Sequence, residues 1–376
     1  MGGRSVAVGV VFGGPSPEHD VSVLTGLQAA RALAGSGRQV SLLYWSKAGE
    51  WYEVAGSPEA EAFLEGVPRG SAELSLVSGP GGGFVVKGGR FARERKVPME
   101  AALVCCHGGP GEDGTLQGLL DSCGVSYAGP TAAGAALGMD KLAFGGLMTA
   151  AGLPTLRRAL VTGDGFVDGP PGPGGPYIVK PRFGGSSIGI EVVDDAATAT
   201  ALAKSSRHLR RGGVVEQWRG DLADVNIAVR TWPALQLSAI ERPLRSTGRE
   251  ILSYSDKYVG GQGMVSAPRE LPAKLPADTA DRIRQLAAAI VVLAGVRGVA
   301  RIDFLVGEQG EIFVNEINTI PGSMSKYLWV QPDVQFSKLL HDMLDEAAAR
   351  PSVAYTSEGA DGTALRSAGS IASKLA

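Results

Sequence analysis

Apolar and polar positions in the first third of the chain predict short buried strands that alternate with helices. Residues 5–12, 39–45 and 101–106 are nearly continuous apolar runs of strand length, and residues 21–34 follow the first run as an expected helix. A strand that passes through a glycine-rich turn into a helix is the first half of a βαβ unit, which favours a mostly parallel sheet. Residues 68–95, rich in glycine, serine and charge, are expected to form an elaborated surface region.

The later part of the chain mixes expected strands with two amphipathic helices. Strand-like runs recur between residues 177 and 241, and apolar residues at core spacing predict helices over residues 277–294 and 335–348. Residues 247–268 carry several glycines and little apolar periodicity. Such a stretch is either a mobile lid over a reacting site or an ordinary exposed loop.

Two alternating runs near the end of this region predict a β-hairpin. Residues 299–306 and 311–318 flank a turn-like insert at 307–310. If the four-residue turn sets the register, Arg301 lies directly opposite Glu316. Residues two apart in a strand share a face, so one surface of the hairpin gathers Arg301, Asp303, Glu316 and Asn318.

This shared face has two interpretations. Carboxylates this close repel one another, and hard oxygen ligands suit Mg²⁺, which takes one or two protein carboxylates together with substrate phosphates. The alternative is a solvated polar face on a half-buried hairpin.

Length, charge and cysteine content limit the class of protein. A chain of 376 residues suggests two or three domains. The net charge of −2 gives no basis for a nucleic-acid or membrane-surface partner. The apolar run near the N-terminus is too short to span a membrane and lacks a cleavage-site pattern. Three cysteines without metal or disulfide spacing favour a reduced cytoplasm.

Polar residues at strand ends give further candidates. Glu18 and His107 each follow an expected strand, where open α/β sheets bind ligands. Glu18 either anchors a substrate ammonium group or favours a helix N-terminus, and His107 either lines a ligand site or satisfies loop backbone groups. Lys180 precedes a glycine–serine loop at residues 182–189, which either folds over a triphosphate or is a hairpin turn. A P-loop kinase is excluded because the lysine precedes the glycines.

Eight motifs in one order make the chain resemble the D-alanine–D-alanine ligases, members of the ATP-grasp superfamily. They are GGPSPEHDVS, HGGPGEDGTLQG, MDK, VKPRFGGSSIG, VEQW, DKY, RIDF and NEINTIPG. The resemblance runs from about residue 5 to about residue 345. Each motif alone is weak, and together at this spacing they are highly specific.

The resemblance implies an α/β fold with α+β character in its ATP-grasp part. An N-terminal parallel-sheet domain is followed by a two-lobed ATP-grasp fold, with ATP between two antiparallel sheets. The implied divisions are a substrate domain at 1–135, a central lobe at 136–213, a C-terminal lobe with lid and metal site at 214–350, and a flexible tail at 351–376.

The resemblance also implies where nucleotide and metal bind. Lys141 and Lys180 would hold the ATP phosphates, Ser187 would belong to the closing loop, Glu216, Trp218 and Arg219 would meet adenine, Asp224 would take the ribose position usually held by Glu, and Lys257 would reach the γ-phosphate. Mg²⁺ or Mn²⁺, expected as two ions, would be held by Asp303, Glu316 and Asn318.

The implied reaction joins two small amino acids. The carboxylate of one D-alanine attacks the γ-phosphorus, and the amine of a second attacks the resulting acyl phosphate. Glu18 would fix the first ammonium group, with Ser186 and Tyr258 linked to it. Arg301 and the Gly322 N–H would stabilise the oxyanion. The resemblance further implies a homodimer and a role in peptidoglycan precursor synthesis.

The acceptor pocket departs from the family pattern. His107 would line the substrate site, and the place of the usual serine–leucine pair is taken by Tyr327 and Leu328. The alternatives are therefore D-alanine–D-alanine ligation, ligation of a different amino acid pair in specialised metabolism, and nucleotide binding without turnover. The intact set of lysines, carboxylates and Arg301 argues against the last.

Overall fold

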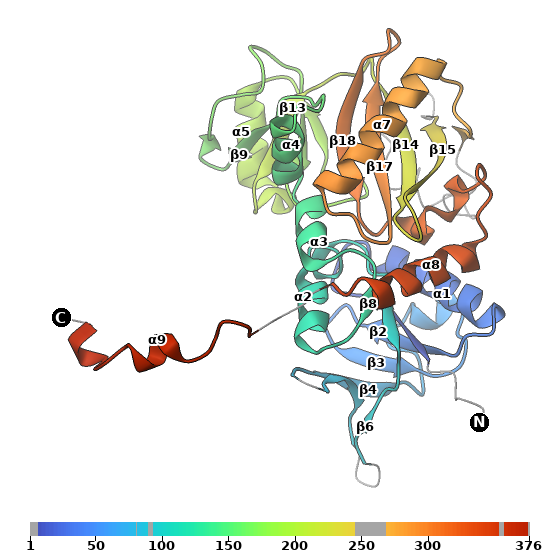
Figure 1. Cartoon of the computed structure of the whole chain (residues 1–376). Coiled ribbons are helices and arrows are strands. Elements are labelled where there is room, and N and C mark those ends of the chain that lie inside the picture. The colour runs from blue at the N-terminus through green and yellow to red at the C-terminus, as the bar shows by residue number, and fades with distance from the viewer. Residues whose placement is uncertain (1–6, 80, 89–92, 245–267, 353–356, 375–376) are drawn as a thin grey trace.

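The computed structural model describes residues 7–79, 81–88, 93–244, 268–352 and 357–374. Their strands form one eight-stranded sheet and two five-stranded sheets. The eight-stranded sheet forms the lower body in Figure 1, and the two smaller sheets lie above it. The expected lid residues at 247–267, including Lys257 and Tyr258, lie outside the described residues.

The N-terminal sheet is parallel in its centre and antiparallel on one side. β1 pairs in parallel with β2 and β7, and β7 with β8, whereas β3 to β6 extend the sheet antiparallel. In sheet order the strands are β6 (Arg95–Lys96), β5 (Gly83–Val86), β4 (Ala72–Val77), β3 (Trp51–Val54), β2 (Val40–Trp45), β1 (Val8–Gly13), β7 (Ala101–Val104) and β8 (Tyr127–Ala128).

The surface region expected at residues 68–95 adds strands to the open edge of this sheet, and most of its described residues are exposed or half-buried. These residues supply β4, β5 and the start of β6, and the side chains of Leu74 and Phe84 are buried in the core. Each strand has only a few apolar positions, and antiparallel pairing along the edge of an existing sheet supplies the remaining stabilisation. The composition of the segment is polar because its other face is solvated.

Helices from both ends of the chain pack against this sheet. The helices are α1 (His19–Gly35), α2 (Thr115–Ser122) and, late in the sequence, α8 (Phe336–Ala349). The helix α3 (Ala132–Met139) follows α2 along the chain and packs beside it. The buried residues Leu339, Leu340 and Met343 of α8 join the same core as Val10 and Val104. Figure 1 shows α8 lying over the lower body beside α1. The chain therefore returns to its N-terminal sheet after completing the others.

The two five-stranded sheets are antiparallel and face each other. The first has the order β10 (Gly165–Phe166), β9 (Ala159–Thr162), β13 (Gly213–Gln217), β11 (Tyr177–Pro181), β12 (Glu191–Val193), with α5 (Ala196–Ser205) packed against it. The helix α4 (Lys141–Ala150) buries Phe144 and Met148 in the core of the other small sheet. The second has the order β16 (Arg269–Glu270), β15 (Gln236–Pro243), β14 (Ala223–Arg230), β17 (Val299–Val306), β18 (Ile312–Asn318).

The helix α7 (Ala277–Leu293) covers the outer face of the second small sheet. Ile283, Leu286 and Ile290 recur at helical spacing, and all are buried against strand residues such as Ile227 and Ile302. Because one face of this sheet is buried under α7, its alternate residues point the other way, toward the first small sheet. That second face carries the polar side chains of the site.

The hairpin β17–β18 forms as expected, but its register differs from the prediction. Arg301 pairs with Asn318, and Asp303 pairs with Glu316. The predicted pairing of Arg301 with Glu316 was wrong for two reasons. The connection is one residue longer than four, since Val306 pairs with Ile312, and a β-bulge interrupts the ladder beyond Asp303.

Shorter elements and the C-terminal residues complete the chain. The 3₁₀ turns are η1 (Ala60–Phe63), η2 (Gly109–Gly111), η3 (Arg207–Leu209), η5 (Gly322–Leu328) and η6 (Ala372–Lys374). Residues 357–374, with α9 (Thr363–Arg366), are largely exposed and extend away from the rest of the chain in Figure 1. Among the described residues, no helix has both the length and the apolar character needed to cross a membrane.

Candidate active site

A cavity lies between the two small sheets and opens toward the N-terminal sheet. It is lined by almost all of the predicted site residues that the structure describes: Glu18, His107, Lys141, Lys180, Ser186, Ser187, Glu216, Trp218, Arg219, Asp224, Arg301, Asp303, Glu316, Asn318, Gly322 and Tyr327. Leu328 is the exception, because its side chain is fully buried in the N-terminal core. Residues from seven of the eight motifs thus meet in one place.

A lone lysine on a helix usually faces solvent, but Lys141 is buried. Lys141 is the first residue of α4 and is only 9% exposed. Its Nζ donates to the Gly184 carbonyl at 2.6 Å. The same Nζ lies 3.1 Å from Glu316 Oε2. Asp140 caps the helix by accepting from the backbone N–H groups of Leu142 and Ala143, which fixes the start of the helix and with it the lysine.

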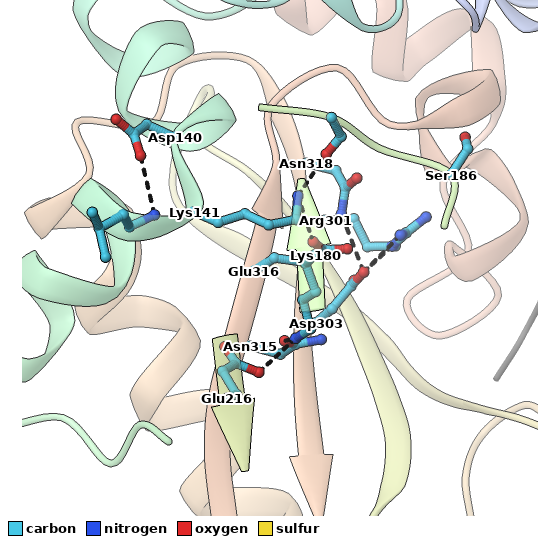
Figure 2. A network of polar contacts seen from close by, with 12 residues as sticks. Asp140, Lys141, Lys180, Ser186, Glu216, Arg301, Asp303, Asn315, Glu316 and Asn318 are labelled. Atoms are coloured by element: carbon cyan, nitrogen blue, oxygen red, sulfur yellow. Dashed lines mark hydrogen bonds and ion pairs between the residues drawn. The ribbon is translucent and has the colours of Figure 1, made fainter. Parts of the chain in front are cut away.

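Lys180 is held by a buried carboxylate. Its Nζ donates to Glu216 Oε2 at 2.6 Å and to Asn315 Oδ1 at 3.1 Å (Figure 2). Burial by itself raises the pKa of Glu216, but the charges of Lys180 and Arg158 outweigh it and hold that pKa below its ordinary value. Glu216 therefore stays ionised. The ammonium group of Lys180 is fixed at the cavity wall rather than free to rotate.

The hairpin face carries the predicted metal set. Arg301 Nε and Nη2 each lie 2.7 Å from one oxygen of Asp303, and Asn318 Nδ2 donates to Asp303 Oδ2 at 3.1 Å (Figure 2). Within the described part of the chain, no three acidic, histidine or cysteine residues form a metal-binding group. Two carboxylates and one amide oxygen fit Mg²⁺ that takes its remaining ligands from phosphates and water.

Asn315 is a site residue that sequence reasoning missed. The bulge in β18 places it between the core residue Val314 and Glu316, and its amide oxygen accepts from Lys180. A strict alternation would have put Asn315 on the face opposite Glu316. The polar pair Asn315–Glu316 inside an otherwise alternating strand was the available signal for a bulge.

Glu18 and the glycine–serine loop meet across the domain junction. Ser186 Oγ donates to Glu18 Oε1, and Glu18 is buried at the start of α1. A side chain on Gly108 or Gly185 would collide with the Glu18 carboxylate, at 2.4 and 2.9 Å. The two glycines therefore let the loops from both sides approach the carboxylate. Ser186 and Ser187 adopt positive φ, a strained conformation that persists where surroundings impose it.

His107 is buried at the end of β7 and neutral. Its Nε2 lies 2.8 Å from Thr25 Oγ1, which also accepts from the Ser323 N–H at 3.1 Å. Burial lowers the pKa of His107 to about 4, with a further contribution from the charge of Arg301 and against a hydrogen bond with the Ile320 backbone. The side chain both lines the cavity and satisfies loop groups, so the two alternatives coexist.

Glu112 is a second residue that the sequence did not single out. Its carboxylate accepts from the Gly108 N–H at 2.9 Å and the Ile320 N–H at 3.2 Å, so it joins β7's loop to the end of β18. Burial, and then the charge of Glu18, raise the pKa of Glu112 to about 8.

Tyr327 also lines the cavity, within a polar cluster. Its hydroxyl donates to Glu241 Oε2 at 3.1 Å, and the Arg269 guanidinium lies over its ring at 4.7 Å. Arg269 Nη1 and Asn226 Nδ2 also donate to Glu241. Burial, and then the charge of Glu241, raise the pKa of Tyr327 well above its ordinary value. The one hydroxyl proton of Tyr327 is thus directed to Glu241.

The fold and the cavity define an ATP-grasp ligase, with two antiparallel sheets that enclose lysines, an arginine and a carboxylate–amide set. Family models support this class. "D-ala D-ala ligase N-terminus" matches residues 7–130, and "D-ala D-ala ligase C-terminus" matches residues 170–345.

Individual relatives agree along nearly the whole length. A D-alanine–D-alanine ligase of Mycobacterium sp. (strain KMS) is 34% identical over 367 residues, which covers 91% of this chain and 96% of the relative. That of Mycobacterium bovis (strain BCG / Pasteur 1173P2) is 32% identical over 372 residues, covering 92% and 96%.

Solved structures share the fold. The VanG D-Ala:D-Ser ligase from Enterococcus faecalis is 25% identical with a TM-score of 0.72, and covers 92% of this chain and 100% of its own. The D-alanyl-alanine synthetase A from Vibrio cholerae, 20% identical, gives a TM-score of 0.74 over 93% of this chain and 100% of its own.

The chain belongs to the D-alanine–D-alanine ligase family. It is an ATP-dependent ligase that acts on small amino acids, in a family that uses ATP and Mg²⁺ and serves peptidoglycan synthesis.

Proposed function

We propose that this chain joins two molecules of D-alanine to D-alanyl-D-alanine, with conversion of ATP to ADP and phosphate, for peptidoglycan precursors in the cytoplasm. The observation that carries the proposal is the convergence of Glu18, two lysines, Arg301 and the Asp303–Glu316–Asn318 set on one cavity. These are the groups needed to bind an ammonium, a triphosphate and a developing oxyanion.

The nucleotide end of the cavity suits a triphosphate. Lys141 and Lys180 supply cationic donors for phosphate oxygens, and the Ser186–Ser187 loop supplies hydroxyls and closely approaching backbone N–H groups. In this proposal Asp224 meets the ribose, while Glu216, Trp218 and Arg219 lie near adenine. Mg²⁺, bound as two ions by Asp303, Glu316 and Asn318, would screen the phosphate charge.

The substrate end suits a small zwitterion. Glu18, held by Ser186, provides the negative charge for the ammonium group of the first amino acid. The carboxylate of that amino acid attacks the γ-phosphorus and displaces ADP, which gives the acyl phosphate. The amine of the second amino acid attacks the acyl phosphate and displaces phosphate. Arg301 and the Gly322 N–H act on the oxyanion of that step, and one such donor contributes about 3–4 kcal/mol to lowering the barrier. Lys257 and Tyr258 are proposed to act from the lid.

A second candidate is ligation of D-alanine to a different acceptor. The observation that favours it is Tyr327, whose ring and hydroxyl are fixed by Arg269 and Glu241 at the acceptor end. A solved relative with a similar fold is a D-Ala:D-Ser ligase. A serine acceptor differs from alanine by one hydroxyl, so recognition at this end decides between the two candidates.

The test is ADP release by the purified chain with Mg²⁺ and ATP across D- and L-amino acids, alone and in pairs. We expect D-alanine alone to support the full rate. Slow release with D-alanine alone and fast release with one particular second amino acid would assign the second candidate. No release with any amino acid would contradict both. Size-exclusion chromatography with light scattering tests the homodimer that the family resemblance suggests.

A further inference from the structure

Arg158 is a buried arginine that the site description above does not use. It lies just before β9, and its side chain is 6% exposed. Its Nε lies 2.8 Å from Glu216 Oε1, an ion pair bent away from regular hydrogen-bond geometry. Its two terminal nitrogens donate to the backbone carbonyls of Lys141 and Asn315. One guanidinium thus links the start of α4, the strand β13 and the bulge of β18.

The surrounding structure makes room for this side chain. Gly145 lies on the face of α4 that Arg158 crosses, and a Cβ at that position would come within 2.4 Å of the Arg158 Nη1. The segments that Arg158 links also carry or contact Lys141 and Lys180, the two lysines proposed to hold the phosphates of ATP. Lys141 and Asn315 each contribute a carbonyl to Arg158 and a side chain to the cavity.

The charges form a line across the wall of the cavity. Glu216 has its Oε1 against Arg158 and its Oε2 against Lys180 at 2.6 Å. Arg158 and Lys180 each carry one positive charge and Glu216 carries one negative charge, so the three side chains together are net positive. Without Arg158, Lys180 and Glu216 would be a neutral pair. A phosphate is attracted only weakly to a neutral ion pair. It is attracted much more strongly to Lys180 when Arg158 neutralises the charge of Glu216.

We propose that Arg158 is a positioning residue for the nucleotide: it neutralises Glu216 from behind, so that Lys180 presents an uncompensated positive charge to the phosphates of ATP. Its donation to two carbonyls at the same time fixes the backbone next to Lys141 and at the bulge. This inference rests on the proposed nucleotide site, and names a residue that acts on the phosphates only through Lys180 and Glu216.

The experiment measures binding of ATP to the full-length chain by isothermal titration calorimetry without amino acids. Arg158→Gln should raise the Kd for ATP about tenfold, and Arg158→Lys, which keeps the charge, should stay within about threefold of the parent. Arg157→Gln, at the exposed neighbouring position, is the matched control and should bind ATP as the parent does. The Kd for adenosine, which has no phosphate, should be the same in Arg158→Gln as in the parent.

A double variant separates the electrostatic role from a purely structural one. In Arg158→Gln/Glu216→Gln, residue 216 carries no negative charge, so the positive charge of Lys180 is again not offset. ATP should therefore bind more tightly to the double variant than to Arg158→Gln alone. A structural role predicts that the double variant is at least as weak as the single one.

Several results would overturn the proposal. They are parent-like ATP binding in Arg158→Gln, equal losses for Arg158→Gln and Arg158→Lys, an equal loss for adenosine, and no recovery in the double variant. If Arg158→Gln does not fold, an increase of about tenfold in the Kd for ATP in folded Arg158→Lys would likewise overturn the proposal. ATP binding without ligase turnover in the parent chain would instead contradict the proposed function and leave the role of Arg158 measurable.

Discussion

The hydroxyl of Tyr327 donates to Glu241 at 3.1 Å, from the η5 turn to β15. The ring is held at the same time under the Arg269 guanidinium. A hydroxyl has one proton to donate, and here the acceptor for it is Glu241. The ring of Tyr327 therefore lines the cavity, while its hydroxyl is committed to the protein.

Replacement of Tyr327 by serine is expected to change the acceptor preference more than the use of ATP. Removing the ring enlarges the proposed acceptor end and takes one hydrogen-bond donor from Glu241, which Arg269 and Asn226 still contact. The ratio of kcat/KM between D-alanine and larger or hydroxylated acceptors should therefore change about tenfold. The KM for ATP should change less than about twofold. Steady-state ADP release with each acceptor measures both.

Tyr327→Phe is the matched control, because it keeps the ring and loses only the hydrogen bond to Glu241. It should retain the parental acceptor preference. An unchanged acceptor profile in Tyr327→Ser would remove Tyr327 from the acceptor pocket.

Glu316→Gln is expected to abolish turnover while leaving the chain folded. The substitution removes one of the two carboxylates of the proposed metal set, and metal-ion stabilisation is worth several kcal/mol. The rate of ADP release should therefore fall roughly 1,000-fold, with a circular dichroism melting curve close to that of the parent. Glu308→Gln, at an exposed position in the connection after β17, is the control. Near-normal turnover in Glu316→Gln would refute the metal assignment.

Glu112 is expected to make the stability of the parent chain fall as pH rises from about 5 to 8. Its folded-state pKa, about 8, lies above its ordinary value of 4.5. The stabilisation is therefore complete below the unfolded-state pKa and is lost as pH rises through the folded-state pKa, with a slope of up to about 1.4 kcal/mol per pH unit.

Glu112→Gln, which is neutral at every pH, should lack this slope. Urea unfolding midpoints at pH 5, 6, 7 and 8 for both proteins give the comparison, and the difference in favour of the variant should grow with pH. Parallel pH profiles of the two proteins would contradict a buried protonated Glu112.

Arg297→Met is expected to destabilise the chain by about 3–5 kcal/mol. The guanidinium donates to the carbonyls of Tyr127 and Gly129, both at 2.8 Å, and of Arg350 at 3.2 Å. Arg297 lies just before β17, so its guanidinium joins that segment to β8 of the N-terminal sheet and to Arg350, the residue that follows α8. Methionine fills most of the volume but leaves buried carbonyls without donors, each at about 1–3 kcal/mol.

The matched control for this prediction is Arg284→Met on the exposed face of α7, where the arginine pairs only with Asp281 among the described residues. That change should alter the free energy of unfolding by less than about 0.5 kcal/mol. Equal shifts in the urea midpoint for the two variants would show that the carbonyl contacts of Arg297 contribute little.

Local patterns in the sequence were sufficient for the parts of the site that depend on neighbouring residues. The period of two along 299–306 placed Arg301 and Asp303 on one face, and the period of the helix at 277–294 placed Ile283 and Ile290 in the core. The glycine–serine loop and the strand-end positions of Glu18 and His107 were visible in the same way. Ordered motifs then identified the family.

Tertiary structure alone decided the relations between distant segments. The bulge that brings Asn315 to Lys180, the burial that protonates Glu112 and the path of Arg158 between three elements each depend on packing across the chain. The edge strands β4 to β6 likewise exist because a sheet is there to receive them. A sequence pattern reports which face a side chain takes relative to its own backbone, whereas burial, register and electrostatic neighbours are set by the segments that close around it.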